Sequence, residues 1–376
     1  MREIQMVDLK SQYKKIKNEI DKAIQEVIDQ ATFINGPQVT RFQEDLENYL
    51  GVKHVIPCAN GTDALQIAMM ALGLKPGDEV ITPSFTYIAT TEVIALLGLT
   101  PVFVDVNPKT FCIDVEQIEK SITPKTKAIV PVHLYGQSAD MDKIMEIATK
   151  YSLYVIEDNA QAIGCDYTHQ DGSISKTGTI GTIGCTSFFP SKNLGCYGDG
   201  GAICTNDDDL AIKLKQIANH GQTIRYHHEM VGCNSRLDSI QAAILSIKLK
   251  KLDEYCDARR KVADFYDKNL GKIKGVTIPY RNTNSSHVFH QYTLQIEGVN
   301  RNDLVNFLAT NGIPSMIYYP IPAHRQKMFD SFNSSSNNLT ITDWLTNRVI
   351  SLPIHTEMEE EQAEYICKQF KIFFER

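Results

Sequence analysis

From residue 54 onward, short hydrophobic runs alternate with longer segments whose apolar residues recur at helical spacing. Most of these runs are almost continuously apolar, which is typical of strands buried on both faces of a parallel sheet. The runs lie at residues 54–58, 79–83, 101–105, 128–132, 154–158, 185–189 and 201–205. Their alternation with helices predicts the α/β fold class, with one large and mostly parallel sheet.

Helical patterns occur on both sides of this region. Residues 10–30 have the spacing of an amphipathic helix, and residues 33–37 interrupt it before a second helical stretch. A long helical pattern at residues 235–270 precedes strand-like runs near Val276 and at residues 291–294. We therefore predict a large domain at residues 1–250, with an N-terminal helical arm, and a small α+β C-terminal domain at residues 251–376.

Composition and charge exclude several classes of protein. The 376 residues carry a formal net charge of −7 and include no basic block that would suit nucleic acid. We find no signal peptide and no apolar run of membrane-spanning length, so we expect a cytoplasmic protein without a membrane partner. The nine cysteines form no C-x-x-C pair, which argues against a metal site and a disulfide framework.

The residues that follow the hydrophobic runs carry the candidate chemistry, because parallel sheets bind ligands beyond the carboxyl ends of their strands. Gly61, Thr62 and Asp63 follow the first run and open a helix. Such a turn offers free N–H groups to a phosphate, although it is also an ordinary helix cap. Tyr87 follows the second run and could lie on an aromatic ligand ring or simply pack against its neighbours.

Two ionisable residues lie at or just beyond the ends of later runs. Asp158 ends the fifth run, where a buried carboxylate needs a cationic partner such as a protonated pyridine nitrogen, or else caps the next helix. Lys192 follows the sixth run and precedes several glycines. A desolvated lysine at such a position can form a Schiff base, whereas most lysines are solvated surface charges. Taken in order, these residues predict one site for pyridoxal 5′-phosphate (PLP).

Six motifs strengthen this interpretation: A-N-G-T-D-A-L at 59–65, P-G-D-E-V at 76–80, E-D-N-A-Q at 157–161, F-P-S-K at 189–192, G-D-G-G at 198–201 and N-S-R-L-D at 234–238. On these motifs the chain resembles the DegT/DnrJ/EryC1/StrS family of PLP-dependent sugar aminotransferases. The resemblance extends from Asp8 to Pro353. It implies PLP-dependent transferase fold type I, which is aspartate aminotransferase-like, and a homodimer with a shared active site.

The family resemblance also implies roles for individual residues. Lys192 matches the lysine that forms the Schiff base with PLP, and Asp158 matches the acid that pairs with its pyridine nitrogen. The other cofactor-binding positions are Gly61, Thr62, Asp63, Tyr87, Gln161, Ser187 and Asn234, the last donated by the partner subunit. The implied substrate-binding positions are His220, Arg236, Tyr318 and Tyr319.

The resemblance further implies transfer of an amino group from L-glutamate to a nucleotide-linked keto sugar. The most similar members act on the C-3 ketone of UDP-2-acetamido-3-oxo sugars for surface polysaccharide or lipid A (lipopolysaccharide) synthesis. The substrate could be a uronate or a hexose, and a dTDP-3-keto-6-deoxyhexose is an alternative. Arg236 could pair with a uronate carboxylate or with the diphosphate. Tyr318 stands where those members have histidine, so the group at C-6 stays open.

Two other functions are compatible with the same scaffold. A PLP-dependent sugar dehydratase of this family would carry histidine at the position of Lys192. A regulator without enzymatic activity would have lost Lys192 or Asp158, or would carry a DNA-binding extension. Because both residues are present, the sequence favours the aminotransferase.

Overall fold

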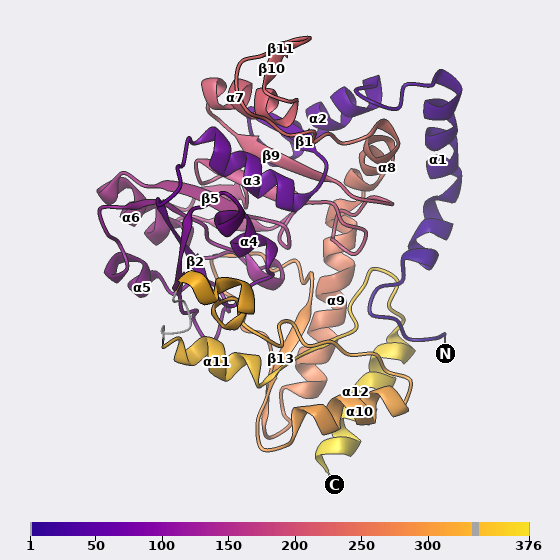
Figure 1. Cartoon of the computed structure of the whole chain (residues 1–376). Coiled ribbons are helices and arrows are strands. Elements are labelled where there is room, and N and C mark those ends of the chain that lie inside the picture. The colour runs from indigo at the N-terminus through magenta and orange to yellow at the C-terminus, as the bar shows by residue number, and fades with distance from the viewer. Residues whose placement is uncertain (1, 333–337, 376) are drawn as a thin grey trace.

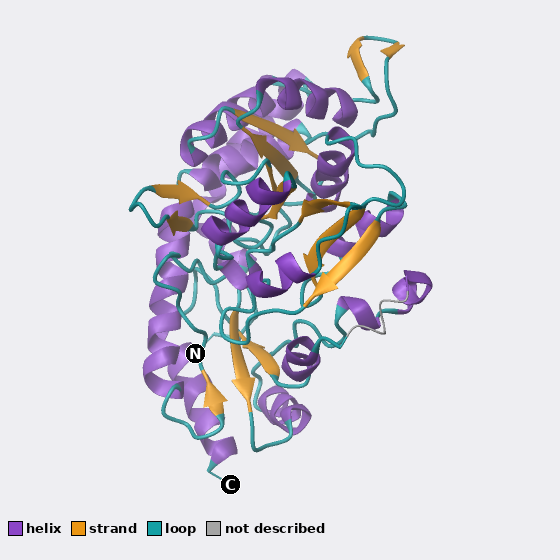
Figure 2. Ribbon diagram, turned by 90° about the vertical axis from the view of Figure 1, so that its left-hand side faces the viewer, coloured by secondary structure: helices purple, strands orange, loops and turns teal. Residues whose placement is uncertain are grey.

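The computed structural model describes residues 2–332 and 338–375 of the chain. Its larger part is a seven-stranded sheet with strand order β1-β9-β8-β5-β4-β2-β3, and helices cover both faces (Figures 1 and 2). The strands are β1 (His54–Cys58), β2 (Glu79–Pro83), β3 (Thr100–Val104), β4 (Thr126–Ile129), β5 (Tyr154–Asp158), β8 (Ile183–Ser187) and β9 (Gly201–Thr205).

The sheet is mostly parallel, which confirms the predicted fold class. Strands β3, β2, β4, β5 and β8 pair in parallel, and only β9, among the paired strands of this sheet, runs antiparallel to its neighbours β1 and β8. Strands β1, β2, β5 and β9 begin and end at the predicted residues, whereas β8 lies two residues earlier than predicted. The parallel strands therefore present their carboxyl ends along one edge.

Helices on the two faces bury separate hydrophobic clusters. Helices α3, α4 and α7 pack on one face, and α2, α5, α6 and α8 on the other. Their bounds are α2 (Pro37–Leu50), α3 (Gly61–Ala71), α4 (Ala89–Leu96), α5 (Val115–Lys120), α6 (Met141–Tyr151), α7 (Asp208–Ala218) and α8 (Ser239–Leu249). The 3₁₀ turn η1 (Leu134–Gly136) and the hairpin β6 (Asp166–Thr168) and β7 (Ile174–Lys176) also belong to this part.

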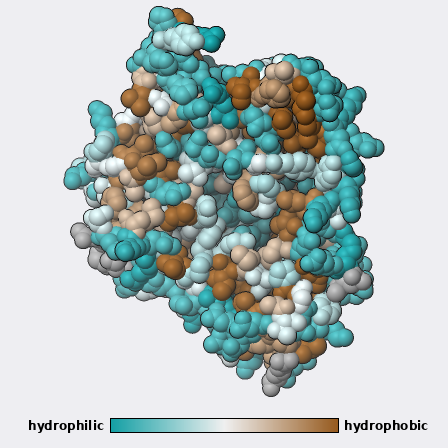
Figure 3. All heavy atoms as spheres, turned by 45° about the vertical axis from the view of Figure 1, so that its right-hand side comes forward, coloured by the Kyte–Doolittle hydropathy of each residue, from teal (hydrophilic) through white to brown (hydrophobic). Residues whose placement is uncertain are grey.

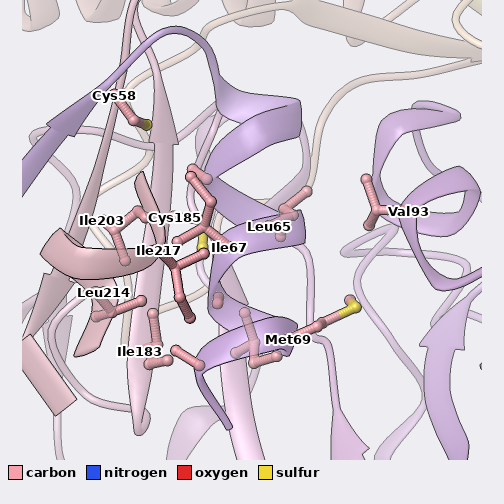
Figure 4. Close-up of a cluster of buried hydrophobic side chains, with 14 of the residues drawn as sticks. Cys58, Leu65, Ile67, Met69, Val93, Ile183, Cys185, Ile203, Leu214 and Ile217 are labelled. Carbon is pink, nitrogen blue, oxygen red and sulfur yellow. The ribbon is translucent and has the colours of Figure 1, made fainter. Parts of the chain in front are cut away.

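Helix α3 has a central place in this packing, as Figure 4 shows. Its side chains Leu65, Ile67 and Met69 lie in one cluster with Ile183 and Cys185 of β8. Burial of each large apolar side chain contributes roughly 1.5–3 kcal/mol. These contacts fix α3 on the sheet, and its first turn is thereby held beside the carboxyl end of β8.

A smaller antiparallel sheet lies at the other end of the molecule (Figure 1). Its strands are β12 (Val276–Thr277), β13 (Tyr292–Ile296) and β14 (Val349–Leu352). The surrounding helices are α9 (Leu252–Leu270), α10 (Arg301–Thr310), α11 (Thr340–Thr346) and α12 (Glu360–Phe374), with the 3₁₀ turns η2 (Ala323–Arg325) and η3 (Lys327–Phe332). Helix α9 connects the levels of the two sheets in Figure 1.

The helical pattern predicted at residues 235–270 is two helices rather than one. Helix α8 ends at Leu249 and α9 begins at Leu252, with a turn at Lys250 and Lys251. Helix α8 packs in the cluster beneath the large sheet, while α9 contributes residues such as Ala263 to the cluster of the small sheet. The first turns of α9 still pack in the same cluster as α8, through Leu252 and Cys256, and the break directs its later turns to the small sheet. The domain boundary near residue 250 stays a prediction.

Two segments extend from the body of the structure. Helix α1 (Leu9–Gln30) corresponds to the predicted amphipathic helix and packs on α8. The hairpin of β10 (Gln222–Ile224) and β11 (His227–His228) projects from the end opposite the small sheet, as Figures 1 and 2 both show. Across the described residues, none of the helices combines the length and apolar character that crossing a membrane requires.

Candidate active site

Strand β5 ends in two adjacent carboxylates with different surroundings. Glu157 is fully buried and accepts hydrogen bonds from the N–H groups of Gly178 at 2.8 Å and Gly181 at 2.6 Å. It also lies 2.8 Å from Nε2 of His133. Successive side chains of a strand point to opposite faces, so Asp158 points away from these groups. Glu157 therefore stabilises the fold, and Asp158 is the carboxylate available to a ligand.

Asp158 is only 5% exposed and has two hydrogen-bond donors within the chain. Thr90 Oγ1 donates to Oδ2 at 2.7 Å, and the N–H of Ala160 donates to Oδ1 at 3.1 Å. The second bond closes a turn and does not cap a helix, because residues 160–164 form turns and β5 is followed directly by β6; the alternative that Asp158 caps the next helix is therefore wrong. The negative charge of Asp158 also acts on Lys192. The carboxylate is thus oriented by α4 and lies near a cation, as a buried charge requires.

Lys192 lies in the turn that follows β8. Its N–H donates to the carbonyl of Phe189 at 2.8 Å. Burial lowers the pKa of Lys192 to about 8, and the Asp158 carboxylate opposes this change to a smaller extent. An appreciable fraction of the side chain is therefore neutral near pH 7, so Nζ can act as a nucleophile or accept a proton.

A network of aromatic side chains joins the two sheets beside Asp158. Gln161 accepts a hydrogen bond from the N–H of Tyr135 at 2.7 Å and donates to the Tyr319 hydroxyl at 2.9 Å. The Tyr135 hydroxyl donates to the carbonyl of Tyr318. The ring centroids of Tyr319 and the exposed Tyr87 lie 6.0 Å apart. Four of the predicted positions, at 87, 161, 318 and 319, are thereby brought together.

The first turn of α3, the end of β8 and the start of β9 meet without room for additional atoms. A Cβ on Gly61 would lie 2.7 Å from Cβ of Ser187, and one on Gly201 would lie 2.5 Å from the carbonyl carbon of Asn60. Asn60 caps the helix by accepting from the Asp63 N–H at 2.8 Å. The N–H groups of Gly61 and its successor precede the first intrahelical bond and are available to a phosphate.

These features fit the separate parts of PLP. The first turn of α3, with the hydroxyls of Thr62 and Ser187, offers donors to the phosphate. The buried carboxylate of Asp158 suits the protonated pyridine nitrogen, and the partly neutral Nζ of Lys192 suits the aldehyde. The residues present therefore match the cofactor in both charge and hydrogen-bonding character.

A different cavity of about 330 Å³ is lined by Arg236 and by the chain neighbours of two other predicted residues, Asn219 beside His220 and Ser235 beside Asn234. Arg236 lines this cavity and donates a long hydrogen bond of 3.4 Å to Asn219 Oδ1. Asn219 also forms an isolated bridge with Asn234, and the adjacent His220 is exposed. Within one copy of the chain, the predicted residues therefore lie in two groups, one around Asp158 and Lys192 and the other around the cavity at Arg236.

Sequence reasoning missed several residues of the first group. Thr90 orients Asp158 from 68 residues away, and Tyr135 orients Gln161 from the turn η1. His290 lies close enough to Lys192 for the two charges to interact. Tyr135 lies three residues after the run at 128–132, so the rule that selected Lys192 could also have selected it. Thr90 and His290 neither closely follow a run of the large sheet nor belong to a motif, so the sequence carried no such signal for them.

Comparison with known proteins identifies the family. The profile of the DegT/DnrJ/EryC1/StrS aminotransferase family matches residues 14–371. The chain belongs to this family. It is therefore an aminotransferase, and PLP is the cofactor that its site fits.

Individual relatives give further detail. The chain is 48% identical, over 97% of its length and 98% of the relative, to the UDP-2-acetamido-2-deoxy-3-oxo-D-glucuronate aminotransferase of Pseudomonas aeruginosa. It is 46% identical, over 99% and 98%, to a pleiotropic regulatory protein of Geobacillus stearothermophilus. It is 45% identical, over 97% and 96%, to the UDP-N-acetyl-3-dehydro-α-D-glucosamine 3-aminotransferase of Acidithiobacillus ferrooxidans.

A solved structure supports both fold and cofactor. The NtdA protein of Bacillus subtilis, with bound cofactor PMP, superposes with a TM-score of 0.90 at 33% identity. The match covers 99% of this chain and 83% of that one. PMP is the aminated form of PLP, so the comparison confirms the predicted fold type and cofactor.

Proposed function

We propose that the enzyme transfers the amino group of L-glutamate to the C-3 ketone of a UDP-linked 2-acetamido-3-oxo sugar. The observation that carries this proposal is the similarity, at 48% and 45% identity over almost the whole chain, to two enzymes named for UDP-linked 3-oxo sugars. One of those substrates is a uronate and the other a hexose. We propose that the amino sugar formed serves the synthesis of surface polysaccharide or lipid A.

The group at C-6 depends on which residues reach the sugar. Arg236 is the side chain that would pair with a uronate carboxylate, since a guanidinium binds a carboxylate through two parallel hydrogen bonds. Tyr318 and Tyr319 would contact the sugar from the side of the small sheet. Arg236 suits a diphosphate equally well, so its presence does not distinguish a uronate from a hexose. The experiment below distinguishes the two substrates.

The chain's own residues supply the acid–base chemistry. Bound PLP provides a carbonyl that takes up the amino group and a ring that accepts electrons. Asp158, oriented by Thr90, keeps the pyridine nitrogen protonated. Lys192 Nζ, with its pKa lowered to about 8, moves protons between the donor α-carbon and the cofactor. The first turn of α3 and Ser187 hold the phosphate.

We further propose that two copies of the chain share each active site. Arg236 lines a separate cavity, and His220 and Asn234 are next in the chain to residues that line it, so a second copy could bring these three side chains to the cofactor phosphate and the sugar. Figure 3 shows hydrophobic side chains gathered in patches on one face. Large apolar side chains that are exposed in one copy include Phe189, beside Lys192, and Ile224, Tyr226 and Val231 at the projecting hairpin. A homodimer would cover such side chains.

The cellular location that we propose is the cytoplasm. All nine cysteines are free, and eight of them are buried. Free thiols persist in a reducing compartment. Nucleotide-linked sugars are also the form in which activated sugars are modified before polymer synthesis, which agrees with this location.

A half-reaction tests the proposal. L-Glutamate should bleach the absorbance of the PLP-loaded enzyme, and candidate keto sugars are then added one at a time. Recovery with the UDP-linked 3-oxo uronate alone would assign the uronate, and Arg236→Leu should then lose that preference. Recovery with the 6-hydroxymethyl sugar alone would assign the hexose. Recovery only with a dTDP sugar would refute the UDP assignment, and no bleaching with any amino donor would refute transamination.

A further inference from the structure

A small cavity lies directly beside the turn that carries Lys192. It measures about 50 Å³, and Ser191, His290, Gln291 and Tyr318 form its polar wall. The remaining wall is apolar and includes Ile354. One water needs roughly 10–15 Å³ of such volume, whereas sites for small organic ligands measure on the order of 300–1,000 Å³. The cavity therefore has room for water but not for an amino acid or a sugar.

Two polar atoms of this wall lack a protein partner. His290 is 8% exposed and Gln291 is 9% exposed. Within the described part of the chain, His290 Nδ1 and Gln291 Oε1 have no hydrogen-bond partner. Leaving such a group unsatisfied costs about 1–3 kcal/mol. A buried water with two to four polar neighbours removes this cost, and the cavity offers both the space and the neighbours.

The backbone at His290 is held in place by the buried guanidinium group of Arg259. Arg259 Nη1 donates to the carbonyls of Phe289 at 3.2 Å, His290 at 3.3 Å and Ile354 at 3.0 Å. Arg259 thus joins the residues before β13 to those after β14. Burial, together with the charges of Lys192 and Arg259, holds the pKa of His290 well below its ordinary value. The imidazole is therefore neutral at physiological pH, and its unprotonated ring nitrogen can accept a hydrogen bond from water.

Each half-reaction involves one water molecule. Release of the oxo acid from the amino donor consumes one water molecule. The water oxygen becomes the carbonyl oxygen of the acid, both water protons end on the amino nitrogen, and the bond between carbon and nitrogen breaks. Condensation with the keto sugar returns one water by the reverse balance. One water must therefore reach the reacting carbon in the first half-reaction and leave it in the second.

We propose that His290 and Gln291 bind this water and direct it to the reacting carbon, so that His290 is a positioning residue for the hydrolytic step. The proposal rests on the aminotransferase function proposed above. It predicts that loss of His290 slows the release of the oxo acid but not the initial reaction of the amino donor with the cofactor.

Three variants test the proposal. His290→Leu removes the ring nitrogens, and His290→Asn places a polar atom near the former Nδ1. His287→Leu is the matched control, because His287 is equally buried in the same segment but its Nδ1 already accepts the Phe289 N–H at 3.0 Å. If His290→Leu does not fold, Gln291→Met tests the other side of the cavity with the same expectation.

Two measurements are made on each purified, PLP-loaded protein. High-resolution crystal structures show whether water occupies the cavity, and stopped-flow mixing with L-glutamate compares bleaching of the cofactor with release of 2-oxoglutarate. We expect water in the wild type and in His290→Asn, and none beside Leu in His290→Leu. Release should slow at least about tenfold in His290→Leu, while bleaching keeps its rate. His290→Asn should recover most of the release rate, and His287→Leu should leave the ratio of the two rates unchanged.

A dry cavity in the wild type would overturn the proposal, and so would equal slowing of bleaching and release in His290→Leu. A wild type that glutamate does not bleach would instead refute the aminotransferase function itself. The two failures are therefore distinguishable.

Discussion

Replacement of Lys192 by methionine separates the contribution of this residue to catalysis from its cost to folding. Burial lowers the pKa of Lys192 from 10.5 to about 8, with Asp158 acting in the opposite direction. At about 1.4 kcal/mol for each pKa unit, a charged Lys192 costs the folded apoenzyme about 3 kcal/mol at pH 7. Methionine has a similar length and no charge. The Lys192→Met apoenzyme should therefore be more stable by about this amount.

The pH dependence of stability has a defined sign. Because the pKa of Lys192 is lower in the folded chain than in the unfolded chain, unfolding takes up a proton between about pH 8 and pH 10.5. The free energy of unfolding of the wild type should rise through this window. The variant lacks this proton uptake, so its advantage should be largest below pH 8 and should vanish above pH 10.5.

Urea unfolding of the two apoenzymes at a series of pH values measures this difference, and the half-reaction with glutamate measures activity. Lys248→Met is the control, because burial also lowers the pKa of Lys248 to about 8. Lys248 Nζ donates to the Gly195 carbonyl at 2.6 Å, and loss of that bond should offset most of the gain. Near-normal turnover of Lys192→Met, or no gain in stability at pH 7, would contradict the reasoning.

Three further changes test other parts of the site. Asp158→Asn should lower kcat by at least about a hundredfold. Glu157→Gln should instead cost about 1–3 kcal/mol of stability and keep kcat. Similar kinetics for the two variants would argue against the assignment of Asp158 to the pyridine nitrogen. Gly61→Ala, whose new Cβ would meet a side-chain carbon at 2.7 Å, should weaken PLP binding on titration of the apoenzyme, and unchanged affinity would exclude the phosphate cradle. Lys192→Met and Asn234→Asp should each be inactive alone. When the two variants are mixed, random pairing should give mixed dimers with one intact site and recover about a quarter of wild-type activity. No recovery would count against a shared active site.

The large sheet was predictable because its signals are local. Continuous apolar runs mark buried strands, and β1, β2, β5 and β9 begin and end at the predicted residues. The rule that ligands lie beyond the carboxyl ends of parallel strands then selected Asp158 and Lys192 from the residues that follow the runs. The first turn of α3 was recognisable for the same reason, since a glycine after a strand and before a helix is visible in the sequence.

The sequence by itself thus determined the fold class, the order of the elements and the ends of strands at which chemistry could occur, because periodicity and turn residues act over short distances. Only the tertiary structure decided what the neighbouring Glu157 does, since its buried partners His133, Gly178 and Gly181 come from other parts of the chain. It also decided which distant residues meet, as when Gln161 binds Tyr319 and His290 approaches Lys192. These contacts depend on how the two sheets pack, and packing has no local signature in the chain.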